Sequence, residues 1–382
     1  PNYARSFVDF SKSFLKYDIQ ARVETVGTVR ANDGAPWIER VQIRAGSVTL
    51  EDIQAYYAYE KLMRHLKRSN SDIVGHLYAD YALKKDDVTI PTYAKHDFNS
   101  GLSKKTRYLK KLWCTVLDND DYLFPVFRLN SGNSLEVELT VASNEIVLKK
   151  LTGTVTGEGF TISNVRFQIH LVKGSDSFIR KFNEMAGNQE LVLPNKVVRR
   201  HLSVIPANQA DAVVFINHNS KNVERVYTVF RRHPTAISDR DQPDLLMGDA
   251  EYESSLQSYQ YEFMSNQYPQ SPCEGGTSEN PAEFLANLLV TAGKSLLYDI
   301  PNVCQWYHIA FAIGQSFKFS DDDIINGLNT NASGSPITLR MKFNTTLSEP
   351  LLVETFAEST IDLVIGPTGG VSVVQRSNML SE

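Results

Sequence analysis

Apolar and polar residues alternate along much of this chain with the two-residue period of β-strands. Segment 161–172 shows the pattern clearly, with apolar side chains at Ile162, Phe167, Ile169 and Leu171. Such alternation is typical of a strand with one buried face. Comparable runs, separated by turns rich in Gly, Asn, Ser and Pro, predict strands at 21–30, 37–45, 107–117, 123–129, 134–141, 146–151, 161–172, 196–204, 212–217, 223–231, 251–265, 306–319, 336–344, 351–358 and 361–366.

Four segments have helical spacing instead, at 3–17, 49–66, 176–187 and 281–292. Thr49 is placed to cap the second of them, and Ser175 or Asp176 to cap the third. Gly187 follows the third as a stop signal. We interpret segment 176–187 as a linker helix between two sets of strands.

The first helical segment, 3–17, spaces Phe7, Phe10 and Phe14 along one face, with charged residues between them. The pattern predicts a short amphipathic helix outside the first strand. Because so short a helix is marginal alone in water, we expect it to dock on its own domain, a neighbouring subunit or a membrane surface.

The predicted order of elements occurs twice along the chain. A strand at 37–45, a helix and a strand at 134–141 in the first half are followed by a strand at 223–231, a helix and a strand at 336–344 in the second. Glu39 and Glu224 lie 185 residues apart, and Ser131 and Ser333 lie 202 apart, each close to half of the 382 residues. The repeat predicts an all-β protein of two tandem eight-stranded antiparallel β-sandwiches, 1–190 and 191–382, with a few short helices between strands.

Composition fits an ordinary globular protein, at 42% hydrophobic and 22% charged residues. No apolar run approaches the ~20 residues of a membrane-spanning helix. No secretory signal opens the chain, and because Pro1 is not an initiator Met we expect a trimmed or processed start. Three widely separated cysteines, Cys114, Cys273 and Cys304, favour a reducing compartment over a disulfide scaffold, and Cys114 is expected to be a buried thiol.

Charge is unevenly distributed over the net value of −5. Residues 1–190 hold 26 basic and 23 acidic residues, whereas residues 191–382 hold 13 and 21. A basic stretch at 61–111 can face nucleic acid, but a solvated face or a subunit contact is the simpler interpretation. Opposite charge on the two halves suits side-by-side packing of subunits.

A catalytic site cannot be assembled from the motifs. The eight histidines lack the spacing of a zinc site, and no P-loop or nucleophile elbow occurs. His170 and His308 lie on strand patterns and are interpreted as packed or surface residues. The glycine-rich run 153–159 is interpreted as a turn because no helix follows it. We therefore predict a protein that is not an enzyme, with no catalytic, cofactor-binding or metal-binding residue and no cofactor.

Two acidic clusters, 118–121 and 321–323, leave calcium binding open, since hard oxygen ligands suit that ion. The simpler interpretation is that both are solvated turns between strands.

The motifs taken together resemble the double jelly-roll major capsid proteins of icosahedral double-stranded DNA viruses, of the Polinton-like virus, adintovirus and virophage type. The resemblance begins at 37–46, which reads Trp-Ile-Glu-Arg-Val-Gln-Ile-Arg-Ala-Gly. It continues at 50–53, 123–126, 135–139, 259–263, 267–269, 280–283, 314–317, 327–330 and 333–339. Segment 69–106 and the tail after Gly366 match nothing in that family.

The resemblance implies a homotrimer whose two jelly rolls per subunit make a pseudo-hexagonal capsomer, and many capsomers would tile an icosahedral shell around a double-stranded DNA genome. It implies contacts with neighbouring capsomers and with minor or penton proteins, and no small-molecule substrate. It places the protein in the virion after assembly inside the infected cell. Excursions 69–106 and 232–250 would be outer loops, and the N-terminal segment would face an inner membrane or the genome.

Two other functions compete with a capsid subunit. One is a glycan- or receptor-binding jelly-roll module, either lectin-like or a minor capsid or spike protein. The other is a glycoside-processing enzyme, which needs two carboxylates across a cleft. For a capsid subunit we expect large interfaces to which outward-facing aromatics contribute, namely Tyr56, Tyr57, Tyr59, Tyr259 and Tyr261.

Overall fold

The computed structural model describes residues 6–22, 28–31, 37–67, 97–99, 105–119, 121–129, 134–152, 159–232, 256–275, 282–293, 311–318 and 327–376. The first strands are β1 (Ser6–Arg22), β2 (Thr28–Ala31), β3 (Ile38–Ala45), β4 (Val48–Gln54), β5 (Asp97–Asn99), β6 (Thr106–Lys110), β7 (Leu135–Val141), β8 (Leu148–Thr152) and β9 (Gly159–Lys173). The later strands are β10 (Leu191–Ile205), β11 (Asp211–Ile216), β12 (Val223–Arg232), β13 (Leu256–Phe263), β14 (Asn266–Glu274), β15 (Ala312–Ser316), β16 (Ile337–Phe343), β17 (Leu351–Ile365) and β18 (Val371–Gln375). The helices are α1 (Tyr56–Lys67), η1 (Val126–Arg128), α3 (Asn144–Val147), α4 (Asp176–Ala186), α6 (Ala282–Thr291) and α8 (Thr330–Ser333).

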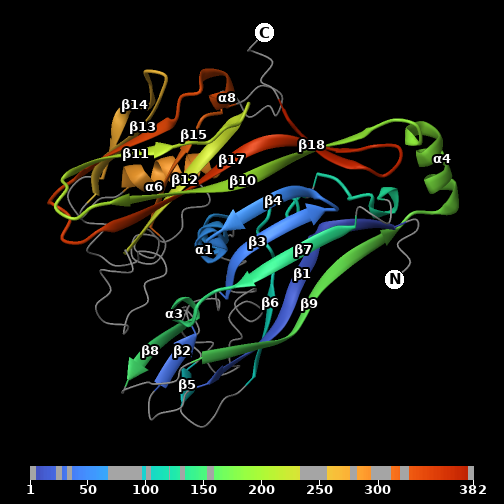
Figure 1. Cartoon of the computed structure of the whole chain (residues 1–382), viewed down its shortest axis with the longest axis horizontal. Coiled ribbons are helices and arrows are strands. Elements are labelled where there is room, and N and C mark those ends of the chain that lie inside the picture. The colour runs from blue at the N-terminus through green and yellow to red at the C-terminus, as the bar shows by residue number, and fades with distance from the viewer. Residues whose placement is uncertain are drawn as a thin grey trace.

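Helix α4 separates two sets of strands (Figure 1), which we call the first strand group (β1–β9) and the second strand group (β10–β18). Ser175 caps α4 by accepting a hydrogen bond from Phe178 N at 3.2 Å, and Gly187 ends it, as predicted. Among the described residues, every sheet is built within one group.

The second strand group consists of two antiparallel sheets with the connectivity of a jelly roll. One sheet has the order β10-β17-β12-β15, with β18 added beside β17, and the other has the order β11-β16-β13-β14. Apart from the hairpins β13–β14 and β17–β18, consecutive strands thus pass from one sheet to the other, which is the double Greek key of eight-stranded jelly rolls.

The first strand group repeats this connectivity. Its sheet β6-β1-β9 corresponds to β15-β12-β17, and its sheet β4-β3-β7 corresponds to β14-β13-β16. Helix α1 lies between β4 and β6 as α6 lies between β14 and β15. Even the isolated bridges match, Val8 to Phe124 in one group and Val223 to Leu328 in the other. A third small sheet, β5-β2-β8, lies at the end of this group away from α4 (Figure 1).

These equivalences confirm one predicted repeat pair and correct the other. Strands β7 and β16 occupy the same position, as the 202-residue offset indicated. The pairing of Glu39 with Glu224 is wrong, because β3, which holds Glu39, corresponds to β13. Strand β12, which holds Glu224, corresponds instead to β1. The shared Glu-Arg-Val letters are coincidental.

The predicted N-terminal helix is also wrong, since residues 6–22 form the long strand β1 paired with β9 and β6. Residues 6–10 of β1 are buried on both faces, so apolar side chains are not confined to alternate positions. Register shifts between Asp9 and Phe14 and between Lys16 and Asp18 disturb the alternation further. The resulting spacing imitates that of a helix.

Several other predicted elements differ from the structure in type or in bounds. Residues 48–54, predicted to begin a helix, form strand β4, and α1 starts only after Ala55, whose φ is +47°. Residues 123–129 form a bridge and the short helix η1 rather than a strand. The two predicted strands 351–358 and 361–366 are the single strand β17. Strands β14 and β18 were not predicted.

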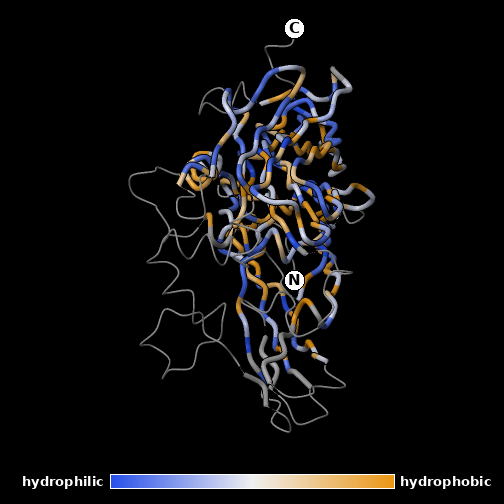
Figure 2. Tube along the Cα trace, turned by 90° about the vertical axis from the view of Figure 1, so that its left-hand side faces the viewer, coloured by the Kyte–Doolittle hydropathy of each residue, from blue (hydrophilic) through white to orange (hydrophobic). Residues whose placement is uncertain are grey.

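The apolar residues of both strand groups meet in one continuous core. Apolar and polar positions alternate along many of the strands that enclose it (Figure 2). Several predicted features lie outside the described residues: most of excursions 69–106 and 232–250, the run 153–158, the acidic run 321–323, His308 and Cys304.

Candidate functional site

The junction between the two strand groups contains buried charged side chains. Its central residue is Glu51 of β4, which is 2% exposed. Its Oε1 accepts hydrogen bonds from Thr115 Oγ1 at 2.8 Å and from Val198 N of β10 at 3.3 Å, and its Oε2 accepts one from Val116 N at 3.3 Å. Thr115 Oγ1 is also hydrogen-bonded to the carbonyl oxygen of Lys196. One carboxylate of the first group therefore binds the backbone of the second.

Burial raises the pKa of Glu51 to about 7, although the hydrogen bonds from Thr115, Val116 and Val198 oppose the shift. The side chain is thus poised between its charged and neutral forms near neutral pH.

Helix α1 packs against the second strand group through aromatic side chains. The rings of Tyr59 and Phe356 of β17 lie 5.2 Å apart, and the guanidinium of Arg231 lies 5.1 Å from the centre of the Tyr57 ring. Such aromatic and cation–π contacts favour one orientation of the helix on the sheet.

The tyrosines expected to face outward are therefore misassigned. Tyr56, Tyr57, Tyr59, Tyr259 and Tyr261 are all at most 4% exposed. Tyr259 and Tyr261 pack against other rings in the interior of the second strand group. Tyr57 and Tyr59 make the contacts of α1 with that group.

A fully buried carboxylate, Glu354 of β17, lies beside α1. It pairs with Arg231 at 2.6 Å and with Arg200 of β10. Glu39 of β3 faces the same cations: burial raises the pKa of Glu39, while Arg231 and Arg200 act to lower it. Two arginines of the second strand group thus pair with Glu354 and also act electrostatically on Glu39 of the first group.

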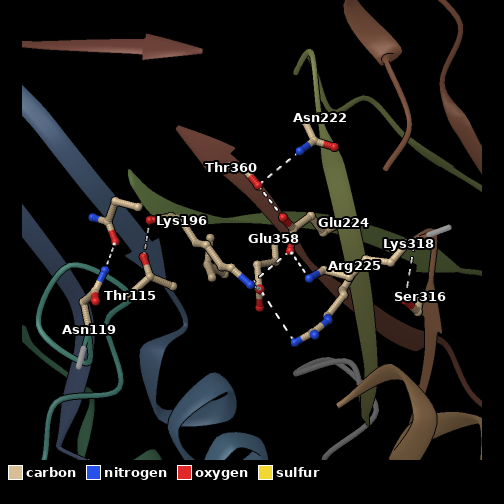
Figure 3. Close-up of polar contacts among 12 residues, drawn as sticks. Thr115, Asn119, Lys196, Asn222, Glu224, Arg225, Ser316, Lys318, Glu358 and Thr360 are labelled. Atoms are coloured by element: carbon tan, nitrogen blue, oxygen red, sulfur yellow. Dashed lines mark hydrogen bonds and ion pairs between the residues drawn. The ribbon is translucent and has the colours of Figure 1, made fainter. Parts of the chain in front are cut away.

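A second ion cluster lies farther along the junction (Figure 3). Lys196 Nζ contacts Glu224 at 3.0 Å and Glu358 at 3.2 Å, and Glu224 also contacts Lys318 Nζ at 3.5 Å. Arg225 lies 3.9 Å from Glu358. Burial would lower the pKa of Lys196, but the carboxylates of Glu358 and Glu224 raise it above its ordinary value.

A cavity of about 280 Å³ opens beside this cluster. Both strand groups line it, through residues such as Met63, Leu66 and Asp118 on one side and Lys196, Glu224 and Glu358 on the other. A glycosidase needs one of its two carboxyl groups to hold a proton. In this cluster each carboxylate is instead paired with two cations, Glu224 with Lys196 and Lys318, and Glu358 with Lys196 and Arg225.

The acidic cluster 118–121 contributes to the same cavity. Asp118 pairs with Lys111, and its side chain is 9% exposed, so it is not a solvated turn residue. Asn119 contacts Asn195 at 3.4 Å and the backbone N–H of Asp121 at 2.8 Å. Among the described residues, no three His, Cys, Asp or Glu side chains are grouped to hold a metal ion.

One constellation has the order of a nucleophile, a base and an orienting group. Ser359 Oγ lies 2.5 Å from His218 Nε2, and His218 Nδ1 lies 3.0 Å from His201 Nε2. Burial lowers the pKa of His218 to about 3 and that of His201 to about 4, so both rings are neutral at pH 7. Ser359 is 1% exposed, so the three groups satisfy one another inside the sheet rather than meet a substrate.

Two further sequence interpretations can be placed. Cys114 is a buried thiol, as predicted, and Cys273 is also buried, which raises its pKa to about 12. His170 is a surface residue 3.9 Å from Asp9. Within the described residues, no helix has both the length and the apolar character to cross a membrane.

Comparison with solved structures gives matches along nearly the whole chain. A chain of the PBCV-1 virus capsid matches with a TM-score of 0.63 at 12% identity, over 97% of this chain and 91% of that chain. The Faustovirus major capsid protein matches with a TM-score of 0.64 at 8% identity, over 99% and 87%. The mavirus major capsid protein matches with a TM-score of 0.52 at 11% identity, over 97% and 85%.

These likenesses, together with the repeated strand order, show that the chain has the double jelly-roll fold that its sequence predicted. No protein-family model and no curated protein sequence matches it.

Proposed function

We propose that this chain is a capsid subunit of an icosahedral double-stranded DNA virus. The observation that carries the proposal is the same strand connectivity twice in one polypeptide, in a fold shared along its length with viral major capsid proteins. A low sequence identity is compatible with this function, because a building block is constrained by its shape more than by particular side chains.

The proposed capsomer is a homotrimer. We assign the two jelly rolls to residues 1–190 and 191–382, with α4 between them. Three chains then present six near-equivalent sides, which is the symmetry of a pseudo-hexagonal tile. Partners are further copies of the capsomer and minor or penton proteins, and the location is the virion after assembly in the infected cell.

A structural rather than enzymatic role is consistent with the junction. Its carboxylates are matched by cations or backbone N–H groups, and the serine beside His218 is buried. These groups hold two sheets together in a fixed orientation. Residues 6–22 lie in a sheet, so the proposal assigns them no contact with a membrane or genome.

Light scattering and electron microscopy test the proposal. The purified chain should elute with three times its mass of 42.9 kDa and form six-sided tiles or closed particles. A stable trimer would bury about 2,000–5,000 Å² per contact, so it should persist at micromolar concentrations. A monomer that forms no tile, and that binds a glycan saturably, would contradict the capsid role and favour the alternative of a binding module.

A further inference from the structure

The outward face of the sheet β6-β1-β9 is the counterpart of a sheet face that is covered at the junction. In the second strand group that face belongs to β15-β12-β17, and α1 packs on it beside Phe356. The bridges of Val8 and Val223 mark equivalent points in the two sheets. Val8 pairs with Leu171 of β9 and Val223 pairs with Ser359 of β17, so equivalent residues of these two strands lie 188 apart.

The charge at one of these equivalent positions is reversed. Arg166 of β9 takes the position of Glu354 of β17, and Gln168 takes that of Phe356. Glu354 and Phe356 are fully buried, whereas Arg166 and Gln168 are exposed. The first strand group thus presents an exposed cation where the second strand group buries a carboxylate beside α1.

Arg166 stands opposite a second cation on the same face of the sheet. Lys16 of β1 pairs with Arg166 in the antiparallel register, so the two side chains point to the same side. We call these two residues the basic pair. Like charges directly opposite one another on a sheet are destabilising. A negative charge brought to this face would therefore stabilise it.

The carboxylates along β1 do not offset the basic pair. Asp9 pairs with Lys12 at 2.8 Å, and Asp18 pairs with Arg107 at 2.8 Å. Both carboxylates are buried, whereas Lys12 is 67% exposed and Arg107 is 58% exposed. Among the described residues, no carboxylate forms an ion pair with either member of the basic pair. This face consequently carries an excess of positive charge, which favours an acidic partner.

The second strand group has an acidic surface at the counterpart of the other side of the junction. That side is formed by β4 and α1, whose counterparts are β14 and α6. Glu274 at the end of β14 and Glu283 at the start of α6 are both exposed, and Glu283 Oε2 accepts a hydrogen bond from Glu274 N at 3.1 Å. Val290 of α6 is 52% exposed beside them in the same helix as Glu283. Residues 256–318 hold five acidic and two basic residues.

We propose that this acidic surface of one chain docks on the outward face of β6-β1-β9 of the next chain in the capsomer, where Glu274 and Glu283 neutralise the basic pair. The proposal rests on the homotrimer proposed above and names the surfaces that join its chains. Figure 1 shows β14 and α6 on one side of the molecule and β9 on the other. Because the two surfaces differ, the contact is heterologous, and such contacts close into a ring when the rotation between copies permits. Opposite charges favour this arrangement over contacts between like surfaces.

Charge reversal in the 382-residue chain, followed by light scattering at micromolar concentrations, tests this contact. Lys16→Glu with Arg166→Glu reverses the basic pair, and Glu274→Lys with Glu283→Lys reverses the acidic surface. We expect each double variant to weaken the trimer by about a hundredfold or more, because like charges then meet in the contact. A chain with all four substitutions should form the trimer again, since the charges that meet are opposite once more.

Lys181→Glu with Lys342→Glu is the matched control. It makes the same change in net charge as reversal of the basic pair, at exposed residues of α4 and β16, and should leave the trimer unchanged. Thermal unfolding of each variant checks that it still folds. Reversal of the acidic surface tests the same contact from the other chain, so the test holds even if β1 and β9 do not tolerate glutamate.

Three results would count against this contact. A trimer that keeps its native affinity in both double variants would overturn the contact and leave the capsomer intact. A fourfold variant that associates as weakly as the double variants would show that the two surfaces do not meet. A native chain that stays monomeric at all concentrations would instead overturn the proposed capsomer, and this contact with it.

Discussion

The carboxylate of Glu51 accepts a hydrogen bond from the backbone N–H of Val198 at 3.3 Å, although 147 residues separate them in the chain. Glu51 lies on β4 of the first strand group and Val198 on β10 of the second. This backbone donor is present whatever side chain residue 198 carries, proline excepted, so the contact helps to fix where the second jelly roll begins relative to the first. The stability of the junction should therefore depend on residue 51.

Replacing Glu51 with alanine should lower the free energy of unfolding by about 3 kcal/mol or more at pH 6, because the buried N–H groups of Thr115, Val116 and Val198 lose their acceptor. Urea denaturation followed by tryptophan fluorescence measures the change. Glu138→Ala is the matched control, since that glutamate pairs with Arg44 at 2.7 Å but is half exposed. It should change stability by less than about 1 kcal/mol. Equal effects of the two substitutions would refute the role given to Glu51.

Glu51 should also make the junction sensitive to pH. Its pKa is about 7 in the folded chain and 4.5 as an ordinary glutamate, so between these values the folded state binds the proton more tightly than the unfolded state. Stability from this group is therefore fully present below pH 4.5 and is lost as pH rises from there through 7, by about 3 kcal/mol in all. The difference in unfolding free energy between the native chain and Glu51→Gln should shrink from pH 5 to pH 8. A difference that is constant with pH would contradict the raised pKa.

Some strands of this fold could be predicted from the sequence, and others could not. Strands β7, β11 and β16 could be predicted because more and less exposed positions alternate regularly along each of them. Strand β1 could not, because residues 6–10 are buried on both faces and two register shifts interrupt the period. Strand β17 was divided in two because its near-complete burial removes the alternation altogether.

The contacts of Glu51 at the junction could not be predicted from the sequence, for a different reason. Glu51 follows Thr49 and precedes Asp52, which imitates the capped and acidic first turn of a helix. Its true partners are Thr115 and Val198, which no local pattern connects to it. The one available signal was the placement of a glutamate at a core-facing position of a strand, and this signal appears only once β4 is recognised as a strand.

His218 and His201 should make the free energy of unfolding depend on pH in the direction opposite to that of Glu51. Because the pKa values of His218 and His201 are lowered to about 3 and about 4, the unfolded state takes up protons below pH 6.5 while the folded state does not. The stability they contribute is present above pH 6.5 and is lost as pH falls toward 4. In a His201→Gln, His218→Gln variant the loss of unfolding free energy between pH 7 and pH 4.5 should be smaller than in the native chain. An equal or larger loss would contradict the proposed neutral pair.

Removing the aromatic contact at the junction should loosen α1 from the second strand group. Phe356→Ala deletes a fully buried ring packed on Tyr59 and should lower the free energy of unfolding by about 3–5 kcal/mol. Phe356→Leu should lose less, because most of the volume is kept. Phe215→Ala is the matched control, since that ring is 58% exposed and its loss should change stability by about 0.5 kcal/mol or less. Thermal unfolding separates the three variants, and similar losses for Phe356→Ala and Phe215→Ala would contradict the packing.

Glu354 should be among the most sensitive charged residues of the chain. Its side chain is fully buried between Arg231 and Arg200, so Glu354→Ala leaves two guanidinium groups without their carboxylate. Removing one partner of a buried ion pair destabilises by about 3–5 kcal/mol, whereas an exposed pair contributes under about 1 kcal/mol. Glu262→Ala, which breaks the more exposed contact of 2.7 Å with Arg340, is the control. Because the lost energy is mainly that of uncompensated cations, Arg231→Met added to Glu354→Ala should recover part of it. A double variant that is no more stable than Glu354→Ala would show that the arginines are not the source of the loss.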